Sequence, residues 1–235
     1  MASVRETKPP NLGWTISSPG QVTFTSVPLR TIITVAYGVP LSLERHKFVG
    51  GPRKILATPF TIQAKGDPAH NSLAMLRTLL AERFGLRTHT EVRQMPIFAL
   101  RRRDREGPYL RPSPYHCRDL LAQELAEGRA LDLAVQHCRR RIPPRFGVSV
   151  RHWTGTMDDL IALVAQPYLD RPVVDMTGLA GNFEWEVAFA PLGSPKTELP
   201  TILAAFEDQL GLKLESRTGP YEVIVIDDVR MPTPN

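Results

Sequence analysis

The sequence predicts an α+β fold made of two similar halves, with mainly antiparallel sheets and helices on one face of each sheet. Three observations lead to this prediction. Similar strand and helix patterns occur in the same order in residues 21–105 and 148–235. The hydrophobic share of 42% and the charged share of 23% are typical of soluble globular proteins. The 22 prolines among 235 residues favour many short elements joined by stiff turns.

Each half opens with a strand that is followed by a short apolar helix. The segment VTFTSVPLRTIITVAYG at 22–38 and the segment VSVRHWTGTMDDLIALVAQ at 148–166 both alternate in polarity and then become continuously apolar. Pro28 suits the first position of the first helix. Thr156, with Asp159 three residues later, has the spacing of a capping box, so we expect the helix of the second half to begin there.

A turn-rich run and a second strand come next in each half. The segments are FVGGPRKILATPFTIQA at 48–64 and RPVVDMTGLAGNFEWEV at 171–187. Both end in apolar residues at every second position, which is typical of a half-buried strand. The alternating residues are Phe60, Ile62 and Ala64 in the first half, and Phe183, Trp185 and Val187 in the second.

The second helix is the clearest match between the halves. The segments NSLAMLRTLLAERFGLRTH at 71–89 and TELPTILAAFEDQLGLKLE at 197–215 each carry an apolar stripe at helical spacing. Gly85 and Gly211 stand where a left-handed C-terminal cap favours glycine. The stripes are Leu73, Leu76, Leu80 and Phe84, and Leu199, Ile202, Phe206 and Leu210.

Each half is expected to close with two strands. The last strand is QMPIFALR at 94–101 in the first half and TGPYEVIVID at 218–227 in the second. A proline precedes the apolar run in both, so we expect a proline turn before the closing strand. The order in each half is therefore strand, helix, strand, helix, strand, strand.

Two segments lie outside the repeats. Residues 1–20 are expected to form an extended N-terminal segment. Residues 106–147 are expected to form an insert, rich in proline and arginine, that bridges the halves and contains a helical stretch. The pattern leaves open whether the repeats, 21–105 and 148–235, pack as one domain or two. It also leaves the oligomeric state open.

Cys117 and Cys138 are the two cysteines of the chain. One straight helix between them would hold the sulfur atoms roughly 30 Å apart, too far for a disulfide. A break at Gly128 could fold the segment into a helical hairpin and bring them together. A disulfide and two free thiols both fit the sequence.

The net charge of +5 comes largely from arginines at 101–103 with Arg105, and at 139–141. No aromatic residues are interleaved with these arginines and no nucleic-acid-binding motif accompanies them, which predicts a solvated basic face and no nucleic-acid partner. No stretch reaches the about 20 apolar residues of a transmembrane helix. The first residues, MASVRETKPPNLGW, lack the apolar region of a signal peptide, so the chain as written is expected in the cytoplasm.

The chain resembles the soil-associated acidobacterial family known as the domain of unknown function DUF3738. The residues that carry the resemblance are ASVRETKPP, VPLRTIITVAYGV, FVGGPRKI, FTIQAK, MLRTLLAERFGLRTHTEVRQMPIFAL, RPVVDMTGLAGNFEWEV and LGLKLESRTGPYEVIVIDDVRMPTPN. Members of that family usually carry an export signal, and some are fused to membrane sensor proteases, which implies a periplasmic or extracellular setting. Hydrolysis of N-acyl-homoserine lactones has been attributed to a soil-metagenome protein near the family. The resemblance thus implies lactone hydrolysis of the quorum-quenching type.

The common hydrolase signatures are absent from this sequence. It contains no G-x-S-x-G, H-E-x-x-H or H-x-H-x-D-H motif, and its six histidines are never spaced to offer two ligands from one helix face. Carboxylates are more numerous, as in Asp158 with Asp159 and Asp227 with Asp228. Oxygen-rich loops suit calcium, although helix-start acids and solubilising surface acids explain the same pattern.

We therefore place the expected site in the loop LDRPVVDMTGLAG at 169–181. Asp170 and Asp175 are the candidate ligands of a calcium ion that polarises the lactone carbonyl. His152 and Asp175 are the candidate catalytic residues that take a proton from water. Gly178 and Gly181 could let backbone N–H groups approach an oxyanion, or they could simply terminate turns. No organic cofactor is expected.

Two functions follow from these observations. The first is a hydrolase of lactone signals, assisted by a divalent metal and acting on a small-molecule ligand. The alternative is a non-catalytic envelope module that binds or senses an unknown ligand, which the missing catalytic signature favours.

Overall fold

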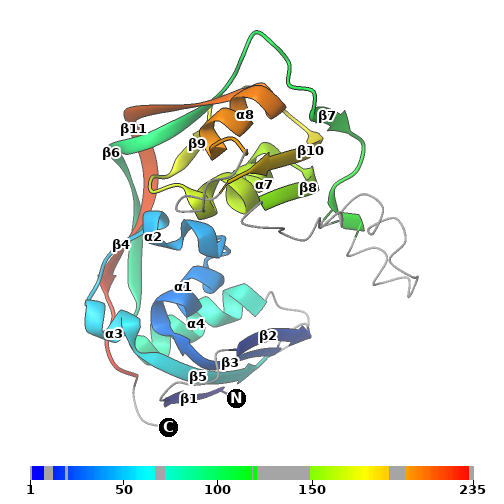
Figure 1. Cartoon of the computed structure of the whole chain (residues 1–235). Helices are drawn as coiled ribbons and strands as arrows, with labels where there is room; N and C mark the ends of the chain where they lie inside the picture. The colour runs from blue at the N-terminus through cyan, green and yellow to red at the C-terminus, as the bar shows by residue number, and fades with distance from the viewer. Residues whose placement is uncertain are drawn as a thin grey trace. The chain divides into compact units, whose positions relative to one another are not determined.

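The computed structural model describes residues 2–7, 13–18, 21–66, 72–117, 119–120, 149–190 and 199–232, with backbone alone for 13–18 and 149–152. The chain divides into two compact units, Met1–Arg93 with Glu222–Asn235, and Gln94–Tyr221 (Figure 1). Each unit combines helices with mainly antiparallel strands, which confirms the α+β class. Within the described residues, every helix is too short or too polar to cross a lipid bilayer.

The first unit contains a four-stranded antiparallel sheet in the order β1-β5-β3-β2. The strands are β1 (Ala2–Glu6), β5 (Pro59–Lys65), β3 (Gln21–Pro28) and β2 (Gly13–Ser18). The expected alternation holds, because Phe60, Ile62 and Ala64 are buried. The register of β3 against β5 shifts between Phe24 and Val27. This shift is a bulge at which Ser26 adopts a left-handed φ of 54°.

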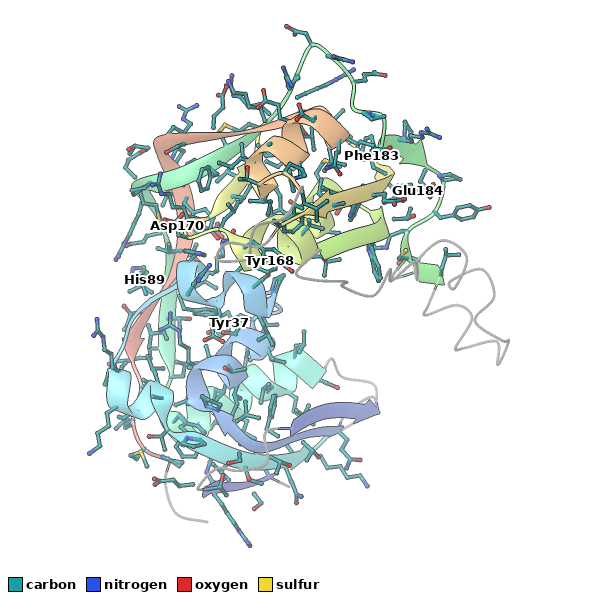
Figure 2. All side chains as sticks on the ribbon, viewed as in Figure 1. Tyr37, His89, Tyr168, Asp170, Phe183 and Glu184 are labelled. Carbon is teal, nitrogen blue, oxygen red and sulfur yellow. The ribbon has the colours of Figure 1, made fainter. Side chains whose placement is uncertain are left out.

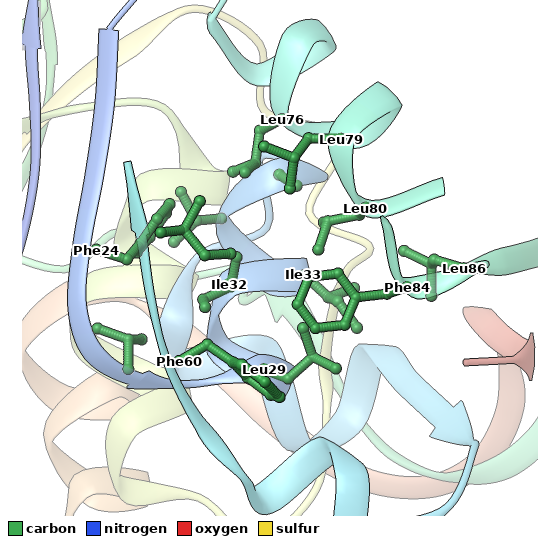
Figure 3. Packing of buried hydrophobic residues seen from close by; sticks show 14 of the residues in the cluster. Phe24, Leu29, Ile32, Ile33, Phe60, Leu76, Leu79, Leu80, Phe84 and Leu86 are labelled. Atoms are coloured by element: carbon green, nitrogen blue, oxygen red, sulfur yellow. The ribbon is translucent and has the colours of Figure 1, made fainter. Parts of the chain in front are cut away.

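Helices α1 (Leu29–Ala36) and α4 (Ser72–Phe84) lie on one side of this sheet and bury their apolar faces against it (Figures 1 and 3). Pro28 is the N-cap of α1, one position before the expected one. The Phe60 and Phe84 rings meet edge to face with centroids 5.0 Å apart. Each fully buried Leu, Ile or Phe contributes about 1.5–3 kcal/mol. The packed residues include Leu29, Ile32, Ile33, Leu76, Leu80 and Phe84.

Short elements complete the first unit. They are η1 (Leu41–Leu43), α2 (Glu44–Lys47), β4 (Phe48–Gly50) and α3 (Arg53–Ala57). Strand β4 pairs in parallel with the end of β11 (Leu212–Asp228), with Phe48 opposite Ile224. The run that begins with Phe48 therefore contains a short strand in addition to its turns.

The second unit contains a three-stranded antiparallel sheet in the order β7-β10-β8. The strands are β7 (Leu110–Ser113), β10 (Asn182–Phe189) and β8 (Ser149–Gly155). Strand β7 comes from the segment we expected to be a bridging insert, which therefore contributes to a sheet. The helical stretch expected in that segment falls almost entirely in residues 121–148, outside the described residues.

Helices α7 (Met157–Leu160) and α8 (Ile202–Leu210) pack on this sheet, and α7 continues through η2 (Ile161–Ala165) and η3 (Gln166–Tyr168). The capping box is confirmed, because the Thr156 side chain accepts from Asp159 N while the Asp159 carboxylate accepts from Thr156 N. Gly211 is confirmed as a left-handed C-cap with φ of 67°. The core of the unit includes Phe183, Trp185, Val187, Phe189 and Phe206.

Each expected pair of closing strands is one continuous strand, β6 (Arg87–Arg102) or β11. Pro96 and Pro220 do not interrupt them, because the fixed φ of proline is compatible with extended backbone. The chain passes from the first unit to the second within β6 and returns within β11. The compact units thus differ from the ranges 21–105 and 148–235, and the internal repeat stays a prediction. In the second unit β6 also pairs in parallel with β9 (Val173–Asp175).

Candidate functional site

The loop expected to carry the site, 169–181, is anchored by a buried glutamine. The Gln166 side chain is fully buried; its Nε2 donates to Arg171 O and its Oε1 accepts from Val173 N, each at 3.0 Å. Met176 N donates to Leu100 O at 2.8 Å. Both ends of β9 are therefore held, and the loop leads directly into β10.

Asp170 and Asp175 have separate partners in this loop. Asp170 is exposed, and its Oδ1 lies 3.8 Å from Arg171 Nε (Figure 2). Asp175 ends β9, and its Oδ1 accepts from Thr177 N at 2.8 Å, closing a local turn. Within the part of the chain that the structure describes, no three His, Cys, Asp or Glu side chains gather as a metal-binding group.

The remaining expected site residues are placed by their backbone. His152 lies in β8 opposite Glu186 of β10, and its side chain is outside the described part. Gly178 and Gly181 have left-handed φ of 69° and 93°. A Cβ atom at either glycine would meet nothing within 4 Å. Glycine is therefore required there by the backbone turn, not by close approach of another group.

An apolar pocket of about 280 Å³ lies within the second unit. Its apolar lining comes from β7, β10, the end of α8, the start of β11 and the loop 169–181. Among the described residues of that lining, Arg102 and Glu106 are the charged ones, and their Nη2 and Oε1 atoms lie 3.0 Å apart. The pocket resembles a small-molecule site, which is usually apolar with a few polar groups. The apolar lining is Leu110, Pro112, Leu179, Phe183, Leu210 and Leu212.

A histidine–aspartate pair lies at one end of the three-stranded sheet. His116 Nε2 lies 3.0 Å from Asp159 Oδ2, and their side chains are only 15% and 10% exposed. The same carboxylate oxygen accepts from Thr156 N and Thr156 Oγ1, each at 3.0 Å. His116 Nδ1 lies 3.7 Å from Asp119 Oδ2. Because the buried carboxylate accepts from Nε2–H, it fixes the orientation of the imidazole ring.

Strand register relates this pair to the pocket. Phe183, which lines the pocket, is paired with Gly155 of β8 on one side and with Pro112 of β7 on the other (Figure 2). A Cβ atom on Gly155 would lie 2.7 Å from Asp159 Oδ2. The Cα atoms of paired residues are about 5 Å apart. Asp159 thus lies beside β8, the strand next to the one that carries Phe183, and neither His116 nor Asp159 is among the described residues that line the pocket.

Cys117 packs beside this pair. It is fully buried, and its Sγ accepts from Thr154 N at 3.3 Å. Cys138 lies outside the described residues. Cys117 is disulfide-bonded, and Cys138 is the one other cysteine of the sequence. Of the two alternatives that the sequence left open, the disulfide is therefore the one present.

Three arginines of the first basic cluster, 101–103, have acidic partners. Arg101 lies 3.7 Å from Glu215, and Arg103 lies 3.2 Å from Glu207. Together with the Arg102–Glu106 pair, these contacts offset much of the positive charge locally. The second cluster, 139–141, lies outside the described residues.

Comparison with known proteins places the chain in a family. A family model described as "Protein of unknown function (DUF3738)" matches residues 30–229. The chain belongs to this family. The match covers all the described residues of the site, from Arg102 to Leu212. No curated protein and no solved structure matches the chain.

The sequence pointed to Asp159 as a helix cap and as one of several carboxylates, and it did not single out His116. The capping spacing could have suggested a buried carboxylate, but no pattern links residues 116 and 159. Gln166 was missed because a lone glutamine carries no signal of burial. Leu179 was part of the expected loop, although its place in a pocket wall depends on strand pairing.

Proposed function

We propose that the chain is a hydrolase that opens lactone rings, with N-acyl-homoserine lactones as its substrates. The observation that carries the proposal is the His116–Asp159 pair beside β8, the strand next to the one that carries Phe183 of an apolar pocket. The pocket suits an acyl chain, and an oriented imidazole suits proton transfer. The choice of lactone follows from the resemblance to the family, because that activity has been attributed to a soil-metagenome protein near it.

His116 acts as the general base in this proposal. The hydrogen bond from Nε2–H to Asp159 leaves the lone pair of a neutral ring on Nδ1, which takes a proton from water. The oxygen of that water bonds to the lactone carbonyl carbon, and the ring C–O bond then breaks. The departing alkoxide receives that proton from His116, so the product is the substrate plus one water: an N-acyl-homoserine, whose new carboxylic acid loses its proton to solvent at neutral pH.

Calcium assistance is a separate part of the proposal. Asp175 and Asp170 would supply carboxylate oxygens to the ion, which would polarise the lactone carbonyl. The backbone N–H groups of Gly178 and Gly181 would stabilise the oxyanion, and His152 is the alternative base. These assignments come from the sequence of the loop, and chelation tests them.

The test is mass spectrometry of an N-acyl-homoserine lactone incubated with the purified protein, with added calcium and with chelator. Ring opening above the buffer rate supports the hydrolase. Turnover that survives chelation removes calcium, with Asp170 and Asp175, from the mechanism. An unchanged lactone under both conditions overturns the hydrolase.

Variants test whether His116 is the general base. We expect His116→Gln and Asp159→Asn to lower the rate by roughly 10²–10⁴-fold, the range for general acid–base catalysis. The matched control is His89→Gln, which removes another histidine hydrogen-bonded to an aspartate, Asp227, in the other unit. Equal rates in His116→Gln and His89→Gln would exclude His116 as the base.

The second candidate is a non-catalytic envelope module that binds or senses an unknown small ligand. Among the described residues that line the pocket, none is His, Ser or Cys. A binding function therefore requires only the pocket itself. Saturable ligand binding without turnover under any metal condition would favour this function.

A further inference from the structure

The charged residues of the apolar pocket form a weak ion pair. Arg102 and Glu106 are joined at 3.0 Å, and their side chains are 53% and 81% exposed. Exposed ion pairs of this type contribute little to stability. Arg102 can therefore exchange Glu106 for another carboxylate at little cost.

The rest of the described lining offers apolar surface to a chain of carbon atoms. Leu110, Leu179 and Phe183 come from three different segments, and Leu210 and Leu212 flank the C-cap of α8. The volume of about 280 Å³ is near the lower end of ligand pockets. One short or medium acyl chain matches this size and polarity.

We infer that the pocket binds an acyl chain that ends in a carboxylate, and that Arg102 pairs with this carboxylate in place of Glu106. A guanidinium offers two parallel N–H donors to a carboxylate, which favours it over a neutral head group. The inference deepens the proposed function, because a ring-opened N-acyl-homoserine is such a molecule. It requires no turnover, so a fatty acid serves as a probe that cannot be hydrolysed.

The experiment is calorimetric titration of the full chain with decanoate, decanol and acetate, all kept below micelle formation. We expect decanoate to bind roughly tenfold more tightly than decanol, as one charge-assisted interaction allows. Acetate, which has the head group without the chain, should not bind measurably. Equal binding of decanoate and decanol, or no binding of decanoate, would overturn the inference.

Variants test each part of the pocket against a matched change. Arg102→Gln should remove the preference for decanoate over decanol, whereas Arg103→Gln, which breaks the Arg103–Glu207 pair outside the pocket, should keep it. Glu106→Gln removes the competing carboxylate and should strengthen decanoate binding several-fold. An unchanged preference in Arg102→Gln would exclude Arg102 as the carboxylate partner.

A further pair of variants tests the apolar lining. Leu179→Asp should abolish binding of both decanoate and decanol, whereas Leu203→Asp, at an exposed position of α8, should not. Comparing the binding of N-decanoyl-homoserine with that of its lactone then shows whether the pocket accepts fatty acids alone or also the ring-opened product. Decanoate binding without lactone turnover would sustain this inference and overturn the hydrolase. Lactone turnover without decanoate binding would overturn this inference and sustain the hydrolase.

Discussion

The backbone of Gly107 lies against the backbone of Gly211, where the segment after β6 meets the end of α8. A Cβ atom on either glycine would overlap the backbone nitrogen of the other. Tyr109 N donates to Gln209 O at 3.0 Å and holds the same segment in place. Both glycines line the apolar pocket, so its wall depends on this close approach.

We expect Gly107→Ala to lower the free energy of unfolding by about 1–3 kcal/mol, because the new methyl group meets rigid backbone. Urea denaturation measures the change. Gly66→Ala is the control, because its methyl group would meet mainly the flexible end of Met75. Equal denaturation midpoints for the two variants would show that the segment can move away from α8.

We expect Asp159→Ala to cost about 1–3 kcal/mol, since it leaves the Thr156 N–H and the His116 ring without their shared buried acceptor. Asp158→Ala, at the exposed neighbouring position, should cost only the few tenths of a kcal/mol of a helix-dipole interaction. Thermal and chemical denaturation compare the two. A loss as small in Asp159→Ala as in Asp158→Ala would contradict the buried network.

We expect Gln166→Glu to destabilise the loop 169–181 by about 1–3 kcal/mol at neutral pH, because the ionised side chain cannot donate to Arg171 O. The loss should shrink at acidic pH, where a protonated carboxyl regains a donor. Hydrogen exchange of the β9 amides reports the loop directly. The exposed Gln63→Glu is the control, and a loss that does not depend on pH would argue against the assigned hydrogen bonds.

His89 should titrate above its ordinary pKa of 6.5 (Figure 2). The hydrogen bond to Asp227, at 2.8 Å, raises the pKa of this imidazole, and the charges of Asp227 and Glu91 add to the effect. Because the pKa is raised in the folded state, protonation of His89 stabilises the fold, and this contribution to the free energy of unfolding is complete below pH 6.5. It is lost as pH rises through the folded-state pKa.

NMR titration of the His89 ring checks this shift. Asp227→Asn should return the pKa toward 6.5. Asp228→Asn, which removes the carboxylate paired with Arg87 instead, should change it little. The same pKa in Asp227→Asn and the parent protein would refute the assignment.

The apolar pocket and the His116–Asp159 pair are features that pattern alone could not locate. The loop 169–181 was expected to carry the site, and one of its residues, Leu179, does line the pocket. His116 and Asp159 are 43 positions apart in the chain, and no periodicity connects them. They meet because β7 and β8 both pair with β10, and long-range strand pairing leaves no local signature in the sequence.

The sequence by itself determined the α+β class, the capping box at Thr156, the glycine cap at Gly211 and the apolar faces of the helices. These features depend on contacts over a few residues, so periodicity and capping chemistry are enough to specify them. Only the tertiary structure decided that β6 and β11 continue through Pro96 and Pro220, that the 106–147 segment supplies β7, and that His116 meets Asp159. Those outcomes depend on which strands pair, and strand pairing is selected by the burial of the whole sheet.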